Sequence, residues 1–441
     1  MVRFSSSVTA SSGGFGIPVA YTRHLHSASR RAILVVALIA AALEACEAPA
    51  APDLLVYVDR PIIIPAAALG WSAVSVGGGH ACGIRATGEL LCWGSNTSGQ
   101  LGVGTARGHC GLKATPCEAS PRLVLTNNRF VQVSAGQFHT CAISSVGALF
   151  CWGDNTHFQL ASPSATAVAT PAPVLPAFQF TGVAAGSTHT CALRTDGVAY
   201  CWGDGTLGAL GRGDTLTSAV PQPVQGSQRF TAIRSGSFKS CALAADESAW
   251  CWGAEWESAS GGFDFYHPQP TAHRIDGLPP LRELAVNVTS VCALTADGAA
   301  YCWESNAYAQ LGNGTLESTG TPTRVSTSQP LKRISTGITQ TCAVAIAGNA
   351  LCWGNNSFGQ LGVPRPGQHC GDSNLECSRT PIAVFGMQQF VSIATGFGNH
   401  VCGITSATAL VCWGLGSEGQ LGDGFTRDRQ SLPVPVAAPS P

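Results

Sequence analysis

Short apolar runs separated by glycine-rich polar segments fill most of the chain, and the same pattern returns seven times. In the third copy, residues 180–186 alternate loosely, and apolar runs at 190–193 and 198–202 flank an Asp-Gly pair. An Asp-Gly between two apolar runs is a strong hairpin signal. A later proline-led stretch, 221–224, suits an edge strand, because proline cannot donate to the sheet ladder. Each copy is therefore predicted to form four short strands.

A Cys-Trp dipeptide marks every copy, and successive dipeptides lie 50 to 60 residues apart. A period near 50 residues is typical of small β units arranged as a propeller or solenoid. The chain ends with one more proline-led strand, 432–436, and the first copy has none before it. We therefore predict an all-β fold over residues 71–437, a seven-bladed β-propeller of four-stranded blades, closed by a C-terminal strand pairing with the first blade.

The cysteine spacing predicts disulfides. Each Cys-Trp cysteine has a partner ten residues earlier, which the hairpin register places directly opposite. Opposed residues at a non-hydrogen-bonded site have Cα atoms about 4.5 Å apart, at the short end of disulfide geometry. The predicted pairs are Cys82–Cys92, Cys141–Cys151, Cys191–Cys201, Cys241–Cys251, Cys292–Cys302, Cys342–Cys352 and Cys402–Cys412, with Cys110–Cys117 and Cys370–Cys377 inside insertions of the two long copies. Tetrahedral zinc, the alternative, is disfavoured because no second pair lies near each first one.

Residues 1–46 are predicted to be a targeting sequence. Basic residues precede an apolar run at 32–43, which is too short to span a bilayer and suits a signal peptide. The run ends in Leu-Glu-Ala-Cys46, which resembles a bacterial lipoprotein processing site, although its glutamate departs from that pattern. We predict lipidation of Cys46, with simple secretion as the alternative, and a proline-rich and alanine-rich tether over 47–70. The expected location is the cell envelope or outer surface, with the lipid as the sole membrane contact.

Composition narrows the function. Charged residues make up 11% of the chain and the net charge is −1, so no basic field attracts nucleic acid or an anionic membrane. Every cysteine except Cys46 has a local partner, which favours an oxidising compartment. No Walker loop, GxSxG, HExxH or dinucleotide fingerprint occurs. We therefore expect a protein that is not an enzyme and that needs no cofactor and no metal.

The repeated motifs HTCAL, DG, YCWG and GQLG resemble the regulator of chromosome condensation repeat family. The resemblance implies a seven-bladed propeller. The family's eukaryotic namesake is a nuclear guanine-nucleotide exchange factor for a small GTPase, and that activity is the less favoured alternative here, since a signal peptide and disulfides do not suit a nucleus. A nearer analogue is the secreted bacterial β-lactamase inhibitory propeller, which implies protein binding outside the cell.

Copy four is the outlier, because aromatic residues replace its GQLG motif. The candidate binding residues are Trp256, Phe263, Phe265, Tyr266 and His267. Aromatic side chains on a loop are favoured binding anchors. Filling the space of the missing leucine is an equally weighted alternative. We expect a protein partner at one rim, with carbohydrate or cell-wall binding as the alternative, in which Trp256 and Tyr266 would stack on sugar rings.

Two further features of the sequence are candidate metal sites. A histidine stands two residues before the first hairpin cysteine at His80, His139, His189 and His400. A hydrogen-bonded histidine that holds a blade turn is favoured over a shared metal site, because equivalent positions on adjacent blades lie far apart. The insertions at 109–117 and 369–377 are predicted to be disulfide-stapled loops on one rim, with a His-Cys-Cys metal site as the alternative.

Overall fold

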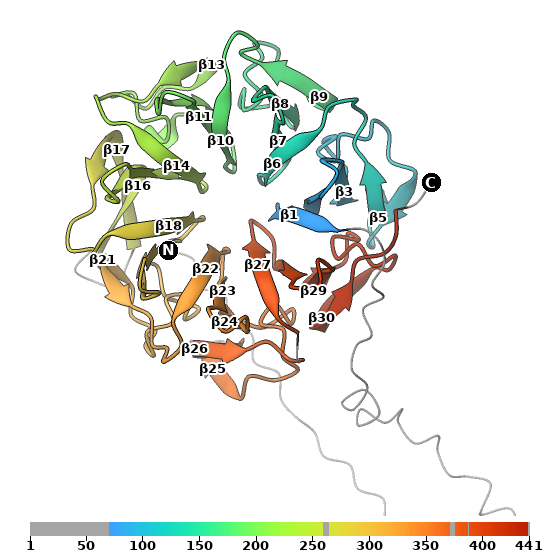
Figure 1. Cartoon of the computed structure of the whole chain (residues 1–441), viewed down its shortest axis with the longest axis vertical. Helices are drawn as coiled ribbons and strands as arrows, with labels where there is room; N and C mark the ends of the chain where they lie inside the picture. Colours follow the sequence, from blue (N-terminus) through green and yellow to red (C-terminus); the bar gives the residue numbers. More distant parts are fainter. Residues whose placement is uncertain (1–69, 259–263, 371–374, 387, 440–441) are drawn as a thin grey trace, which may run out of the picture. The chain divides into compact units, whose positions relative to one another are not determined.

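The computed structural model describes residues 70–439, apart from 259–263, 371–374 and 387. In this part of the chain, β-strands form seven sheets around a central axis (Figure 1), so the predicted all-β, seven-bladed propeller is confirmed. The described residues contain one 3-10 turn, η1 (Thr206–Gly208), and no helix among them could cross a membrane. The predicted targeting segment 1–46, with Cys46, and residues 47–69 of the predicted tether lie outside the described residues.

Each blade contains four antiparallel strands, ordered from the centre of the ring outwards. The innermost strands are β1 (Trp71–Val76), β6 (Phe130–Ala135), β10 (Phe180–Ala185), β14 (Phe230–Ser235), β18 (Leu281–Val286), β22 (Leu331–Thr336) and β27 (Phe390–Thr395). The second strands are β2 (His80–Arg85), β7 (His139–Ser144), β11 (His189–Arg194), β15 (Lys239–Ala244), β19 (Ser290–Thr295), β23 (Gln340–Ala345) and β28 (His400–Thr405).

The third and fourth strands complete each blade. The third strands are β3 (Leu90–Ser95), β8 (Leu149–Gly153), β12 (Ala199–Gly203), β16 (Ala249–Ser258), β20 (Ala300–Glu304), β24 (Ala350–Asn355) and β29 (Leu410–Gly416). The outer strands are β5 (Thr115–Leu123), β9 (Val168–Val174), β13 (Ser218–Pro223), β17 (Asp264–Arg274), β21 (Thr319–Arg324), β26 (Leu375–Ala383) and β30 (Arg427–Pro435). Blades one and six gain a fifth, β4 (Gly108–Cys110) and β25 (Gln368–Cys370).

The turn between the second and third strands sets the register of each hairpin. In blade three, Gly197 adopts a φ of +82°, and this turn places Cys191 opposite Cys201. Blades four and seven keep a positive φ at the same position with Glu247 and Thr408, at +64° and +61°. A side chain at positive φ is strained, so the hairpin register overrides the local preference in these two blades.

The structure contains the nine disulfides that the spacing predicts. The seven hairpin disulfides join Cα atoms 4.1 Å apart. Their cysteines are fully buried between the blades. The two loop disulfides join Cα atoms 5.7 and 5.8 Å apart and staple the β4–β5 and β25–β26 ladders. The hairpin disulfides are thus part of the blades, whereas the loop disulfides stiffen insertions.

The predicted closure of the ring is wrong. The C-terminal strand β30 pairs with β29 of the seventh blade, where Val434 lies opposite Cys412, and it does not pair with the first blade. The reason is that the proline-led strand of every copy follows its own hairpin and pairs with the third strand. In the first copy this strand is β5, which lies beyond the insertion and pairs with β3. Every blade is therefore one continuous segment.

The ring closes through side-chain packing instead. Trp71 of blade one shares an apolar cluster with Ile404, Leu410 and Val436 of blade seven. The backbone N–H of Trp71 also donates a hydrogen bond to the Thr408 carbonyl oxygen at 3.1 Å. Similar clusters lie between each pair of neighbouring blades, so the core of the protein is a ring of interfaces. The closing interface is one of seven similar interfaces.

We predict that the hairpin disulfides stabilise the fold. Replacing Cys191 and Cys201 together by alanine is expected to lower the free energy of unfolding by about 2–3 kcal/mol, because the unfolded chain loses a ten-residue constraint. Urea unfolding followed by tryptophan fluorescence measures this change. The matched control replaces Cys110 and Cys117, whose loop can open without separating blades, and we expect a smaller effect. Equal midpoints for the hairpin variant and the parent protein would contradict the prediction.

Candidate functional site

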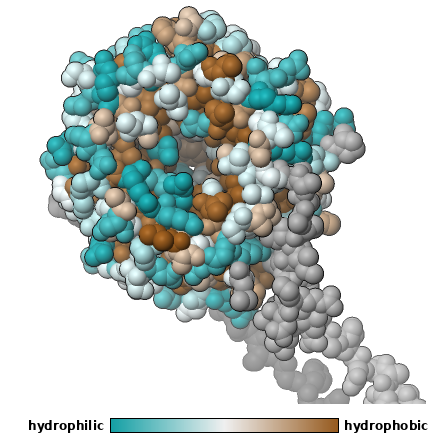
Figure 2. Space-filling view, in the orientation of Figure 1, coloured by the Kyte–Doolittle hydropathy of each residue, from teal (hydrophilic) through white to brown (hydrophobic). Residues whose placement is uncertain are grey.

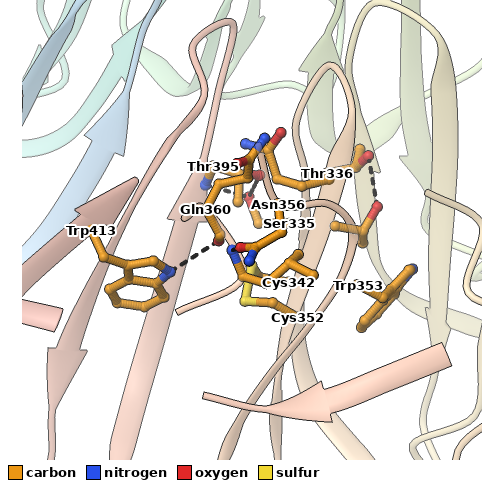
Figure 3. The surroundings of a disulfide bond; sticks show 12 residues. Ser335, Thr336, Cys342, Cys352, Trp353, Asn356, Gln360, Thr395 and Trp413 are labelled. Atoms are coloured by element: carbon orange, nitrogen blue, oxygen red, sulfur yellow. Dashed lines mark hydrogen bonds between the residues drawn. A yellow bond between two sulfur atoms is a disulfide. The ribbon is translucent and has the colours of Figure 1, made fainter. Parts of the chain in front are cut away.

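A repeated hydrogen bond joins most pairs of adjacent blades, and we call it the inter-blade lock. In six of the seven Cys-Trp pairs, the tryptophan donates its indole N–H to a backbone carbonyl oxygen in the loop of the preceding blade, as Figure 3 shows for Trp413 and Gln360. The lock pairs are Trp93–Gln420, Trp152–Gln100, Trp202–Gln159, Trp252–Ala209, Trp353–Gln310 and Trp413–Gln360, at 2.8–3.1 Å. The carbonyl belongs to the GQLG motif or to its equivalent.

The loop that presents this carbonyl is itself fixed from within. In blade one, the Asn96 side-chain oxygen accepts a hydrogen bond from the Leu101 N–H at 3.0 Å, and the Gln100 side-chain oxygen accepts one from the Ser98 N–H at 2.8 Å. Leu101 is fully buried, so the leucine of the motif fills the core between blades one and two. The N…GQLG motif is therefore scaffold.

Three of the four histidines form hydrogen bonds across the same interfaces. His80 Nε2 lies 2.9 Å from the Thr140 hydroxyl of blade two, and that hydroxyl donates to the Gln100 carbonyl oxygen at 2.8 Å. Because the hydroxyl hydrogen is already used, the imidazole must be the donor. His139 lies in the same way against Thr190, and His189 against Ser240. These histidines hold neighbouring blades together, and no described group of His, Cys, Asp and Glu is arranged to hold a metal ion.

Burial keeps the histidines neutral. It lowers the pKa of His80 and His139 to about 3 and that of His189 and His400 to about 4, and all four side chains are fully enclosed. A neighbouring histidine lowers the pKa of His80 and His139 further. At neutral pH all four are therefore uncharged, and His80, His139 and His189 act as neutral hydrogen-bonding groups.

Blade four departs from this design in its third and fourth strands. In place of a GQLG loop, β16 and β17 continue as a long hairpin, paired as far as Ser258 and Asp264 (Figure 1). The aromatic residues that sequence analysis selected lie on or beside this extension. Phe263 falls outside the described residues, and so does the side chain of Phe265. The hairpin is the largest departure from the repeat among the described blades.

Trp256 is buried, with 7% of its surface exposed. Its six-membered ring lies over Gly320 of β21, where an added Cβ would come within 3.4 Å of the ring. Trp256 therefore packs the hairpin against blade five. This position favours the alternative in which Trp256 fills the space of the missing leucine. Its strand partner Tyr266 is half-buried, and His267 is exposed.

Charged groups follow the exposed side of the hairpin. Glu255 lies 3.5 Å from His267 Nε2 and 3.6 Å from His273 Nε2, and Glu257 lies 3.5 Å from His267 Nδ1. Burial lowers the pKa of His273, while Glu255 opposes that shift. Phe238, which is 38% exposed, lies beside the base of the hairpin, where its carbonyl oxygen accepts the Ala254 N–H at 2.7 Å. We call Phe238, Glu255, Glu257 and His267 the blade-four rim.

A buried ion pair that sequence analysis missed supports this rim. Lys239 stands where four of the other blades have histidine, and Glu304 stands where the other blades have glycine after the Cys-Trp pair. The two side chains bond to each other across blades four and five, and the residues are only 7% and 3% exposed. Burial raises the pKa of Glu304, and Lys239 opposes the shift. The sequence signal for this ion pair is Cys-Trp-Glu in blade five, where the other blades have Cys-Trp-Gly.

The stapled insertions arise from the same connection as the blade-four hairpin. The β4–β5 and β25–β26 ladders and the β16–β17 hairpin all extend the link between third and fourth strands. Since third strands run in the same direction in every blade, these elaborations leave the same end of the ring. This arrangement agrees with the prediction that the insertions share one rim.

Comparison with protein families identifies the repeat. One model of the regulator of chromosome condensation (RCC1) repeat matches residues 87–143, 146–193, 196–243 and 297–344, and a second matches 71–100, 130–159 and 180–209. Together they cover about half of the chain. The human probable E3 ubiquitin-protein ligase HERC3 is 40% identical over 89 residues, which are 20% of this chain and 8% of that protein. The matched segment is thus a small part of that relative.

Solved structures share the fold. Human WBSCR16 has a TM-score of 0.64 at 20% identity, covering 75% of this chain and 86% of that one. A yeast structure described as Kap60 bound to RCC1 (Prp20) gives a TM-score of 0.69 at 17% identity, covering 84% of this chain and 86% of that one. At these identities the likeness concerns the propeller alone.

We predict that protonation of the buried histidines destabilises the fold in acid. Their folded pKa values lie below the ordinary 6.5, so the unfolded chain binds more protons below that pH, and stability falls as the pH drops from about 6.5 towards 4. His139→Gln should make this fall shallower by about 1.4 kcal/mol per pH unit. Urea unfolding at several pH values measures the slope. Blade six shows that glutamine fits, because Gln340 donates to the Gly398 carbonyl oxygen at 3.2 Å. An unchanged slope would refute the assignment.

We also predict that the buried ion pair cannot be broken singly. Glu304→Gly leaves Lys239 buried without its partner and should cost about 3–5 kcal/mol of stability. The double variant Lys239→His with Glu304→Gly places at these positions the residues found in blades one and two, His80 and Gly153, and should recover most of that loss because it removes the buried charge. Chemical unfolding of the two variants beside the parent protein tests this. Equal stability of the single and double variants would show that the pair carries no such coupling.

Proposed function

Because the chain belongs to the regulator of chromosome condensation repeat family, we propose that it is an extracytoplasmic scaffold that recognises a protein partner through the blade-four rim. The observation that carries this proposal is the replacement of the inter-blade lock loop by the β16–β17 hairpin in blade four. A connection that is released from the inter-blade lock can carry recognition on its exposed side. The lipid anchor at Cys46 belongs to the same proposal and would hold the propeller at the envelope.

The compartment is supported by the cysteines. Nine disulfides suggest an oxidising, extracellular environment, since reducing compartments keep thiols free. Such a location does not suit nucleotide exchange on a nuclear GTPase, which remains the least favoured function. The ligase activity in the name of HERC3 belongs to a protein of which the matched segment is only 8%.

The rim has the properties of a protein-binding surface. Trp256 and the Lys239–Glu304 pair fix the hairpin from below, so binding orders little additional chain. Above them, Phe238 offers an apolar contact, while Glu257 is 72% exposed beside His267. An apolar centre with a charged margin is the usual anatomy of an interface. The two glutamates favour a basic contact surface on the partner.

Two observations bear on the choice between protein binding and carbohydrate or cell-wall binding. A structural neighbour of the same fold, yeast RCC1 (Prp20), is described as bound by the protein Kap60, so this kind of propeller accommodates protein partners. Carbohydrate or cell-wall binding relied on stacking by Trp256 and Tyr266. The burial of Trp256 removes one of those two faces, and protein binding is therefore the favoured function.

Crosslinked affinity capture from the native envelope tests the proposal. The full chain is tagged at its C-terminus, and the parent protein is compared with Glu257→Lys combined with His267→Ala, two exposed changes that spare the core. We expect one protein to be enriched with the parent and lost by at least about tenfold with the variant, since interface charges steer association. Asp276→Lys, an exposed change beyond the hairpin of the same blade, is the control and should retain the partner.

Three outcomes would contradict the proposal. Equal enrichment with the rim variant would place the partner elsewhere on the ring. Recovery of glycan or peptidoglycan in place of protein would favour wall binding. Absence of any specific enrichment would leave the hairpin a packing element.

A further inference from the structure

The innermost strands enclose a central channel of about 250 Å³, to which all seven blades contribute. Figure 2 shows the ring hollowed at its centre. The lining mixes apolar residues with hydroxyl and amide side chains, among them Gln132 and Asn287. A volume of this size holds about eight water molecules at their share of liquid volume, so it also fits a small organic molecule.

One position of the inner strand distinguishes blade four from every other blade. At the fifth residue of that strand, the other six blades carry only serine or alanine: Ser75, Ser134, Ala184, Ala285, Ser335 and Ala394. Blade four carries Arg234 at this position. All seven residues line the channel, so a single guanidinium enters a space that the other blades keep open.

Few protein groups satisfy Arg234. Among the described residues, its one hydrogen bond runs from Nη1 to the carbonyl oxygen of Ile233, at 2.9 Å. A guanidinium has five N–H donors, so several face the channel. Glu283 also lines the channel but makes no ion pair with Arg234, and its Oε2 lies 4.0 Å from Arg333 Nη1. Glu283 and Arg234 thus face the same space without a direct bond between them.

Two charged side chains line the channel, the guanidinium of Arg234 and the carboxylate of Glu283. Burial lowers the pKa of Arg234, but an arginine stays protonated under any condition at which the protein folds. Among the described residues no carboxylate accepts a hydrogen bond from this guanidinium, so its donors are open to a small anion.

Serine hydroxyls elsewhere in the channel lining, on blades one and two, add hydrogen-bond donors. Ser75 accepts the Ala135 N–H and Ser134 accepts the Ala185 N–H, each at 2.9 Å. With a lone pair occupied in this way, each hydroxyl keeps its hydrogen for a ligand. The channel thus combines a guanidinium with neutral donors in a confined space.

We propose that the central channel is a binding site for a small monocarboxylate, held by Arg234. The guanidinium and a carboxylate match in planar geometry and can form two parallel hydrogen bonds. A phosphate, with nearly two negative charges at neutral pH, would exceed the single positive charge available and face Glu283. This site lies on the inner strands and is separate from the protein-binding rim.

Isothermal titration calorimetry with acetate and lactate, in a buffer free of chloride, tests the proposal on the full chain. We expect saturable binding that Arg234→Ser weakens by about tenfold to a hundredfold, as the loss of hydrogen bonds to a charged group predicts. The variant should fold, since blades one, two and six carry serine at this position. Arg229→Ser, which removes an exposed arginine just before β14, is the matched control and should bind as the parent does.

A second variant distinguishes binding from a structural role of the arginine. Glu283→Gln removes the carboxylate that repels an incoming anion, so it should tighten acetate binding, whereas damage to the channel would weaken it. Acetamide, which has the same shape without charge, should not bind. Saturable binding that Arg234→Ser leaves intact would overturn the proposal. So would the absence of acetate and lactate binding to the parent protein, or a preference for inorganic phosphate.

Discussion

The hydrogen bond from a Cys-Trp indole to a backbone carbonyl oxygen of the preceding blade, made in six of the seven blades, is the constraint on which the rest of the ring depends. A single such bond contributes only about 1 kcal/mol, but a buried indole N–H without an acceptor costs about 1–3 kcal/mol. The need for an acceptor at each indole therefore fixes the positions of the loop residues around it. The asparagine of the loop holds the turn that presents the carbonyl, as Asn356 does for Leu361 in blade six, and the leucine fills the space beneath. The threonine hydroxyl adds a second donor to the same oxygen.

Blade four shows what happens where the loop is lost. Without a GQLG turn, Trp256 fills the interface, and the Lys239–Glu304 pair joins blades four and five at the position where His139 and Thr190 join blades two and three. Breaking one half of a buried ion pair is costly, so the two residues depend on each other. The next interface, between blades five and six, carries the Glu283–Arg333 contact, and Arg234 of blade four lines the channel. Blades four to six therefore differ from the other blades in charged residues on the inner strands as well as in the hairpin.

Much of the scaffold could be predicted from the sequence because its determinants are local. A spacing of ten residues across a hairpin fixes both the register and the disulfide, and seven copies fix the number of blades. The closure was predicted wrongly because a periodic sequence does not mark where a blade begins, and only the pairing of Val434 with Cys412 decides it. Trp256 is buried against Gly320, and Lys239 bonds to Glu304, which lies 65 positions later in the chain. Both contacts join residues far apart in the sequence, so the repeat pattern does not predict them.

The arrangement of the blades explains how one sector can differ without loss of the ring. Each blade packs only against its two neighbours, so an altered interface is absorbed locally and the remaining locks stay intact. The hairpin disulfides strengthen this independence, because each blade keeps its register by a covalent link of its own. A rigid ring with one altered sector presents its unusual side chains in fixed positions, which lowers the entropic cost of recognition. The regular blades therefore supply rigidity, and blade four supplies the unusual side chains. A binding protein needs both.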